Sequence, residues 1–298
     1  MDDAELEAFR ESGRKAARVR EDSKRLIMVG ESLLDIAETV EQMIAEEGGK
    51  PAFPVNISIN DIAAHYTPEF ESEASLDDND VVKIDLGIDL NGALSDTAYT
   101  IDLSGKNEEL VRASEEALQN AIAMIKPGVT VGEVGTKIED TIRGKGFKPI
   151  SNLTGHMIKS NELHAGVEIP NIKSNDPYQF AEGDIFAVEP FATTGAGYVE
   201  DLEQVEIFSI YAPSNVRMRQ SRKIIEHVIK NYGMLPFAER WVRKEFSSKL
   251  LVSAALKELL QNHFLRGYPV LRDAGKGLVS QAEHTILVTA DGCEVLTK

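Results

Sequence analysis

Two aspartates in one predicted β-hairpin have the spacing of a metal site. Asn91-Gly92 is a strong two-residue turn signal between an apolar run over residues 81–87 and a second run over residues 93–103. With these two residues as the loop, Asp85 lies diagonal to Asp96 across the hairpin. Both carboxylates then project from the same face, about 7–8 Å apart at the backbone. This suits two metal ions about 3.5–4 Å apart that share a bridging carboxylate.

The surroundings of Asp85 distinguish a metal site from a solvated pair of acids. Two acids on neighbouring strands are more often exposed to solvent than bound to a metal. The strand before Asp85, however, is almost wholly apolar, and a buried carboxylate needs a partner. We therefore favour a metal as that partner.

The rest of the sequence excludes several other kinds of chemistry. It contains no Walker phosphate loop, Gly-x-Gly-x-x-Gly fingerprint, Gly-x-Ser-x-Gly elbow or His-Glu-x-x-His zinc helix. Its single cysteine, Cys293, excludes an internal disulfide framework and a Cys-rich zinc site. The net charge of −17 argues against DNA or another nucleic acid as the partner of the whole chain. No signal-like or membrane-spanning run is present, so we expect a cytoplasmic protein that does not bind membranes, with a monomer as the default state.

A helix signature occurs twice along the chain. An amphipathic helix is expected from about Ser32 to Glu47, within a stretch that starts at Gly30. The same pattern recurs from Gly128, where Thr130 and Glu133 form a capping box. Sequence typical of β-strands follows both helices.

A pair of strands repeats in the same way. The apolar runs over residues 80–85 and 184–189 each end in a carboxylate. We predict an α+β fold with two α/β halves related by a pseudo-two-fold, which places Asp85 and Glu189 facing each other across the middle. The alternative is a chance similarity between short amphipathic helices.

A helical insert is expected over residues 211–264, inside a larger domain formed by residues 1–210 plus 265–298. Three helices are predicted in it: Val216–Tyr232, Pro236–Phe246 and Lys249–Phe264. From Ser214 to Gly267 there are eleven Lys and Arg against four Asp and Glu. A face of the insert could meet ribosomal RNA, although ordinary solvated helix surfaces are the more common explanation.

Several short motifs together resemble the methionine aminopeptidases of the pita-bread metallopeptidase fold. Lys83-Ile84-Asp85-Leu86-Gly87, with Asn91-Gly92 and Ser95-Asp96, is similar to the metal-binding hairpin of that family. Further matches, in the family's order, are Ala64-His65-Tyr66-Thr67-Pro68, Leu153-Thr154-Gly155-His156, His164-Ala165-Gly166, Val188-Glu189-Pro190-Phe191 and Gln281-Ala282-Glu283-His284-Thr285. The resemblance runs from about residue 5 to the C-terminus, and the helical insert is typical of the type 2 branch.

The resemblance implies a dinuclear metal site with five ligands. Asp85, Asp96, His156, Glu189 and Glu283 match the family's ligands, with Asp96 and Glu283 bridging. Four carboxylates and one imidazole suit Mn²⁺, Fe²⁺, Co²⁺ or Zn²⁺, and the sequence does not choose among these ions. A water made acidic by both ions would attack the methionyl carbonyl, and Glu189 would take its proton.

The resemblance also implies which residues contact the substrate. His65 and His164 would hydrogen-bond the scissile amide and help protonate the leaving amine. Phe53, Leu163 and Tyr268 match positions that line the pocket for the methionine side chain. Without the motifs, all five would be read as ordinary core residues.

The expected reaction is removal of the initiator methionine from nascent proteins, with a preference for a small second residue. A prolidase or X-Pro aminopeptidase would share the ligands but would carry a large N-terminal domain. A non-catalytic ribosome-binding relative would have lost ligands, whereas all five stand here. The chain departs from the family at Ile88-Asp89, where Thr-His is common, and at Leu86, where Phe is frequent. Neither position is a ligand.

Overall fold

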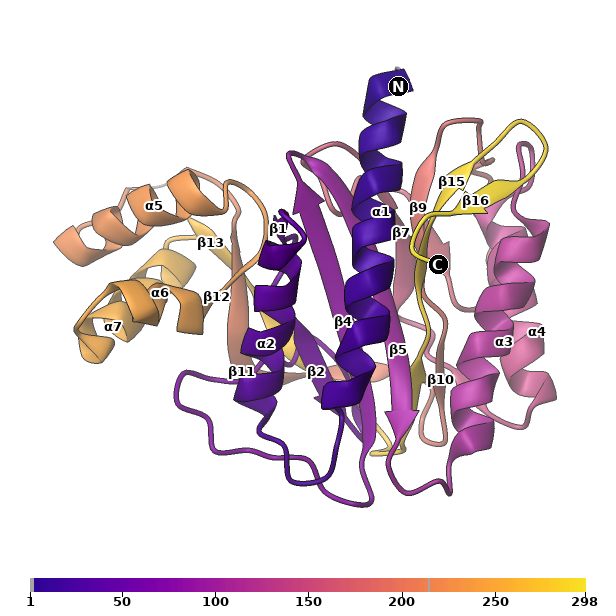
Figure 1. The fold of residues 1–298 in the computed structure, drawn as a ribbon, viewed down its shortest axis with the longest axis horizontal. Helices are drawn as coiled ribbons and strands as arrows, with labels where there is room; N and C mark the ends of the chain where they lie inside the picture. Colours follow the sequence, from indigo (N-terminus) through magenta and orange to yellow (C-terminus); the bar gives the residue numbers. More distant parts are fainter. Residues whose placement is uncertain (1–2, 214) are drawn as a thin grey trace.

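Curved antiparallel sheets form the centre of the computed structural model, and helices cover their outer face (Figure 1). The structure describes residues 3–213 and 215–298. Its helices are α1 (Asp3–Ser23), α2 (Leu33–Glu46), α3 (Glu108–Met124), α4 (Val131–Gly144), α5 (Arg219–Asn231), α6 (Glu239–Glu245) and α7 (Lys249–Gln261), with a short 3₁₀ turn at Lys24–Leu26. Among the described residues, no helix combines the length and apolar character needed to cross a membrane.

The strands are numbered in the order in which they occur along the chain. They are β1 (Lys50–Pro51), β2 (Asn56–Ile59), β3 (Ile62–Ala64), β4 (Val81–Leu90), β5 (Ala93–Asp102), β6 (Lys148–Pro149), β7 (Thr154–Ile158), β8 (Glu168–Pro170), β9 (Ile185–Val188), β10 (Phe191–Thr193), β11 (Val199–Ile210), β12 (Phe237–Ala238), β13 (Leu265–Asp273), β14 (Val279–Gln281), β15 (His284–Val288) and β16 (Cys293–Val295).

The two predicted halves are present, and each combines one capped helix with an antiparallel sheet. In the first half, Ser32 caps α2 by accepting a hydrogen bond from the Asp35 amide, and β4 pairs with β1, β2 and β5. In the second half, Thr130 and Glu133 form the predicted capping box of α4, and the sheet order is β16-β15-β9-β7-β8. The predicted α+β fold with duplicated halves is therefore confirmed.

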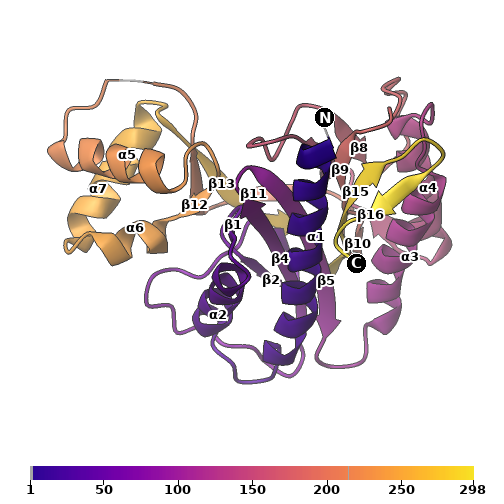
Figure 2. The same ribbon diagram turned by 45° about the horizontal axis from the view of Figure 1, so that its top comes forward.

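The insert stands to one side of the sheets in both views (Figures 1 and 2). Its helices are shorter than predicted, because α5 begins at Arg219, α6 begins at Glu239 and α7 ends at Gln261. Before α6, β12 pairs with β11 instead of extending the helix. A separate apolar cluster holds the insert together, with Phe208 and Leu265 closing it from β11 and β13. The division into two domains at residues 211 and 264 stays a prediction.

A buried ion pair joins the insert to α2. The Arg240 side chain is fully buried and pairs with Glu41, which also accepts a hydrogen bond from Trp241 Nε1 at 2.9 Å. Arg240 Nη1 also donates to the hydroxyl of Thr67 at 2.6 Å. The Val55 amide donates to the same Glu41 carboxylate at 3.3 Å, and the Thr67 hydroxyl donates to the Val55 carbonyl at 2.8 Å. These contacts fix the chain segments that carry Phe53 and His65.

Glu206 on β11, close to this network, should make stability depend on pH. Burial, followed by the charges of Glu239 and Glu69, raises the pKa of Glu206 to about 8. The folded protein therefore binds this proton more tightly than the unfolded chain, and Glu206 lowers stability progressively as the pH rises from about 4.5 to about 8. We expect Glu206→Gln and the wild type to have the same melting temperature at pH 5. At pH 8.5 the melting temperature of Glu206→Gln should be about 2–4 °C higher. Equal melting temperatures at both pH values would contradict this.

Candidate metal centre and substrate cavity

The β4–β5 hairpin places its two aspartates as predicted. Leu90 pairs with Ala93, so Asp85 lies opposite Ala98 and Asp96 lies opposite Gly87, two residues along the same face. The loop residues Asn91 and Gly92 have φ values of 54° and 96°, as the tight two-residue turn requires. The turn signal thus fixed the register that brings the carboxylates together.

Glu283 is held beside this hairpin by hydrogen bonds between β5 and the segment before β15. The Thr97 hydroxyl donates to the Glu283 carbonyl at 2.9 Å, and the Glu283 amide donates to the Ala98 carbonyl at 3.1 Å. The Asp96 amide donates to the Thr285 hydroxyl at 2.8 Å. Residues far apart in sequence are therefore held together by backbone contacts, which keeps the two carboxylates adjacent.

His156 and Glu189 come from the second half. His156 lies on β7 opposite Ala187 of β9, and Glu189 directly follows β9. His156 Nε2 is 3.5 Å from Asp96 Oδ2 and 3.6 Å from Glu189 Oε1. Asp96, His156 and Glu283 each offer a ligand atom, and these atoms lie within 4.8 Å of one another. The two halves therefore meet at one cluster of potential ligands.

The electrostatics of this cluster fit a bound cation. Burial, followed by repulsion from neighbouring carboxylates, raises the pKa values of Asp85, Glu189 and Glu283 well above their usual range. Three buried carboxylate oxygens of the cluster have no hydrogen-bond partner among the described residues: Asp85 Oδ1, Asp96 Oδ1 and Glu283 Oε2. Buried polar atoms are rarely left unpaired, and a divalent cation would both pair these atoms and offset the repulsion.

All ten residues predicted for the site line a single cavity of about 450 Å³. They are Phe53, His65, Asp85, Asp96, His156, Leu163, His164, Glu189, Tyr268 and Glu283. The side chains of Phe53 and Leu163 are 5% and 6% exposed. They form an apolar wall of the cavity, in contrast to the carboxylates of the ligand cluster. The cavity is large enough for a small ligand. The individual roles of these residues stay predictions.

The two histidines outside the ligand cluster lie on different walls of the cavity. His65 has a φ of 64°, and its Nδ1 is 3.1 Å from the Pro269 carbonyl. Because a carbonyl only accepts, Nδ1 carries the proton and a neutral ring leaves Nε2 as an acceptor. The His65 ring meets Tyr268 edge to face at 5.6 Å. Burial lowers the pKa of His65, so its ring is neutral near pH 7.

His164 also lines the cavity and lies against the ligand cluster. Its ring centroid is 4.3 Å from that of His156. Although the side chain is exposed, partial desolvation by the cavity walls lowers the pKa of His164, and His156, His65 and Arg266 lower it further. A neutral imidazole here can accept or donate a hydrogen bond at neutral pH.

Several polar residues that line the cavity were not predicted as site residues, among them Asn56 and Arg266. Asn56 pairs with Asp85 across β2 and β4, and Arg266 lies over the Tyr268 ring at 5.4 Å. A polar residue within the apolar run around Asn56 was a usable signal. No such signal marked Arg266. This residue lies on β13, and only the pairing of β13 with β11 directs β13 toward the cavity.

Comparisons with known proteins agree with this geometry. The family model "Metallopeptidase family M24" matches residues 7–290. The chain is 47% identical to a methionine aminopeptidase from Methanocaldococcus jannaschii over 97% of both chains, and 45% identical to one from Thermococcus kodakarensis over 98% of this chain and 99% of the relative. The crystal structure of methionine aminopeptidase from Thermotoga maritima shares the fold, with a TM-score of 0.74, 23% identity, and coverage of 100% and 98% of the two chains. With its pita-bread fold and its buried ligand cluster, the chain belongs to metallopeptidase family M24.

Proposed function

We propose that the protein is a methionine aminopeptidase, which hydrolyses the peptide bond after the initiator methionine of nascent proteins. The observation that carries this proposal is the convergence of five metal-ligating side chains and an apolar wall on one cavity. Relatives that are 40–47% identical over nearly their whole length carry the same name. The identity and coverage of these relatives favour this assignment over a prolidase, an X-Pro peptidase or a non-catalytic binding protein.

Asp85, Asp96, His156, Glu189 and Glu283 would hold the divalent metal that this family implies. We propose two ions, with Asp96 and Glu283 shared between them, and cobalt, manganese, iron or zinc as candidates. When bound, such ions supply an acidic water and polarise the scissile carbonyl. The paired acids on β4 and β5 and the single imidazole on β7 make up a mainly oxygen donor set.

The remaining residues would bind the substrate and move protons. Phe53, Leu163 and Tyr268 would enclose the methionine side chain, whose flexible thioether adapts to an apolar wall. Glu189 would take the proton from the attacking water. His65 and His164 would hydrogen-bond the scissile amide and help pass to the leaving amine the proton that Glu189 takes from the water. We further propose a preference for small second residues.

Peptides that differ in their first two residues test this assignment. We expect Met-Gly-Met-Met to lose only its first methionine, while Met-Lys and Ala-Pro peptides stay intact. Efficient release from Ala-Pro would indicate an X-Pro peptidase. Removal of several residues in succession would contradict the substrate preference.

His164→Ala should lower kcat by about 10²–10⁴-fold, the usual contribution of a positioned acid–base group. The side chain is exposed, so melting temperature and metal content should stay unchanged. Steady-state kinetics on Met-Gly-Met-Met measures the effect. His263→Asn is the matched control, because His263 is exposed in the insert and Asn tolerates its φ of 55°. Equal activity of both variants would remove His164 from the mechanism.

We also propose that the protein works in the cytoplasm, next to the ribosome. Arg217, Arg219, Arg222 and Lys223 are all exposed at the start of α5, on an otherwise strongly acidic protein. Contacts with ribosomal phosphates would weaken steeply with salt. We expect cosedimentation with ribosomes to fall between 50 and 200 mM salt and to disappear when these four residues are changed to Glu. Salt-independent cosedimentation would argue against phosphate contacts.

A further inference from the structure

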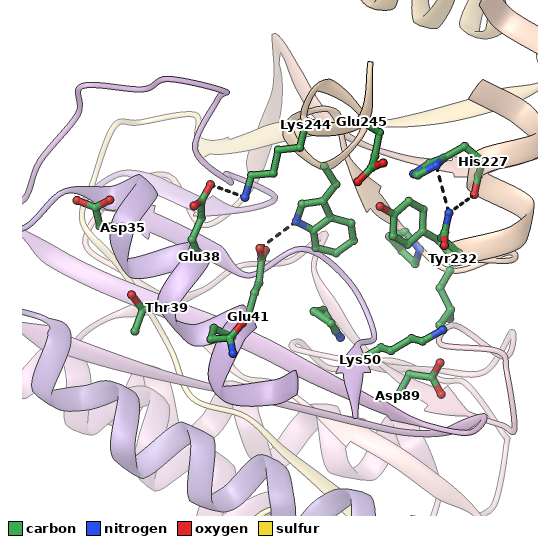
Figure 3. Close-up of a pocket in the computed structure, with 16 residues that line it drawn as sticks. Asp35, Glu38, Thr39, Glu41, Lys50, Asp89, His227, Tyr232, Lys244 and Glu245 are labelled. Atoms are coloured by element: carbon green, nitrogen blue, oxygen red, sulfur yellow. Dashed lines mark hydrogen bonds and ion pairs between the residues drawn. The ribbon is translucent and has the colours of Figure 1, made fainter. Parts of the chain in front are cut away.

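A second hollow of about 860 Å³ lies between α2 and the insert, outside the catalytic cavity (Figure 3). We call it the α2–insert cleft. Asp35, Glu38 and Glu41 of α2 line one side of it, and Tyr232, Trp241 and Glu245 of the insert line the other. Nothing in the proposed reaction uses this cleft, although it is the larger of the two hollows.

The insert side of the cleft presents a fixed aromatic surface. The rings of Tyr232 and Trp241 are 5.2 Å apart. Trp241 Nε1 is tied to Glu41, and Tyr232 also stacks on Phe237 at 5.7 Å. Aromatic faces held in this way attract Lys and Arg side chains through cation–π contacts and through packing of the apolar stem.

The cleft is acidic overall, with five carboxylates against two lysines among its lining residues. Glu41 is committed to Arg240, and Glu38 pairs with Lys244 at 2.7 Å. By contrast, Asp35 and Glu245 are exposed, and neither side chain has a hydrogen bond or an ion pair among the described residues. Glu245 is therefore a free carboxylate beside Tyr232, on the same side of the cleft as the aromatic surface (Figure 3), an arrangement that complements a cation.

The catalytic cavity and the α2–insert cleft share one wall residue, Pro236. The two hollows therefore adjoin at Pro236, and an extended peptide that advances about 3.3 Å per residue can reach from one to the other. Asp89, at the position where the sequence departs from its family, lies on the rim of the cleft and not in the catalytic cavity.

We propose that the α2–insert cleft binds an arginine or lysine side chain of the substrate, several residues after the methionine. This inference rests on the proposed function, because the basic side chain belongs to the same chain whose methionine occupies the catalytic cavity. The guanidinium or ammonium group pairs with Glu245, while Asp35 adds to the negative charge of the cleft, and the stem packs on the aromatic surface. The cleft thus adds a preference for basic residues beyond the second position.

Trp241 makes occupancy measurable without catalysis, because it is the only tryptophan of the chain. The probes are decapeptides that begin with Met-Ala and continue with Gly and Ser residues. Each carries a single arginine, placed at one position from 4 to 9. Matched peptides carry citrulline, the neutral isostere of arginine, at the same position. With metal-free protein, we expect saturable changes in Trp241 emission for arginine at one or two positions and not for citrulline. Asp35→Asn with Glu245→Gln should remove this difference, whereas Glu182→Gln, an exposed acid near β9, should keep it.

Kinetics with the metal-loaded enzyme separates this inference from the proposed function. Arginine at the favoured positions should raise kcat/KM about five-fold over citrulline, through KM and not through kcat. Cleavage of Met-Ala-Ser with no arginine effect on emission or KM at any position would overturn the inference and leave the proposed function standing. Arginine-specific emission changes without methionine release would overturn the proposed function. The bound peptide would then not be a substrate, and the cleft would be a peptide-binding site only.

Discussion

Replacing Glu283 with Gln is expected to abolish methionine release while the protein stays folded. Glu283 is 1% exposed, and one of its oxygens has no hydrogen-bond partner among the described residues. The substitution removes one of the proposed ligands, and the several kcal/mol that a metal supplies correspond to a rate reduction on the order of 10³-fold or more. The assay is methionine release together with metal content by elemental analysis.

The same variant should stabilise the metal-free protein. Burial and the charges of Asp96, Glu189 and Asp85 raise the pKa of Glu283, so a neutral amide of the same shape relieves repulsion in the cluster. Thermal unfolding after chelation should therefore give a higher melting temperature than for the wild type. Asp291→Asn, at an exposed turn, serves as the control and should change neither activity nor stability. Full metal content in Glu283→Gln would contradict its role as a ligand.

Replacing Arg240 with Met should cost about 3–5 kcal/mol of unfolding free energy, as expected when one partner of a buried ion pair is removed. Glu41 would then lie buried without its main counter-charge, and Thr67 would lose a hydrogen bond. Burial raises the pKa of Glu41 and the charge of Arg240 lowers it, so Glu41 depends on Arg240 to stay ionised. Denaturant unfolding measures the cost.

Two further variants separate the ion pair from packing. Glu41→Gln combined with Arg240→Met removes both charges and should recover part of the lost stability. Lys244→Met breaks only the exposed pair with Glu38 and should cost less than about 1 kcal/mol. Because the network holds the segments with Phe53 and His65, Arg240→Met should also raise KM for Met-Gly-Met-Met. Equal costs for Arg240→Met and Lys244→Met would contradict the importance of burial.

Local signals explain which parts of the fold were predictable. The Asn91-Gly92 turn determined the hairpin register, and capping residues located the starts of α2 and α4. The predicted strand over residues 284–288 is β15 without change. The insert helices were predicted too long, because propensity alone does not show that Phe237 pairs with Phe208 on β11.

Long-range contacts explain what the residues alone could not reveal. Geometry brought Asp85 and Asp96 together and the repeated strands placed Glu189 opposite Asp85, but His156 and Glu283 entered the site only through resemblance to a known family. Their approach depends on hydrogen bonds across nearly two hundred residues, such as the one from Thr97 to Glu283. The Arg240–Glu41 pair spans a similar separation in sequence, and no local sequence pattern indicates it.

Metal reconstitution tests the central claim most directly. The purified protein is stripped of metal, and Mn²⁺, Co²⁺, Fe²⁺ or Zn²⁺ is added back separately before methionine release from Met-Gly-Met-Met is measured. The predicted result is no release from the metal-free protein and release of the first methionine alone with at least one of these ions. Absence of release with every ion, from a protein shown to be folded, would contradict the assignment as a methionine aminopeptidase.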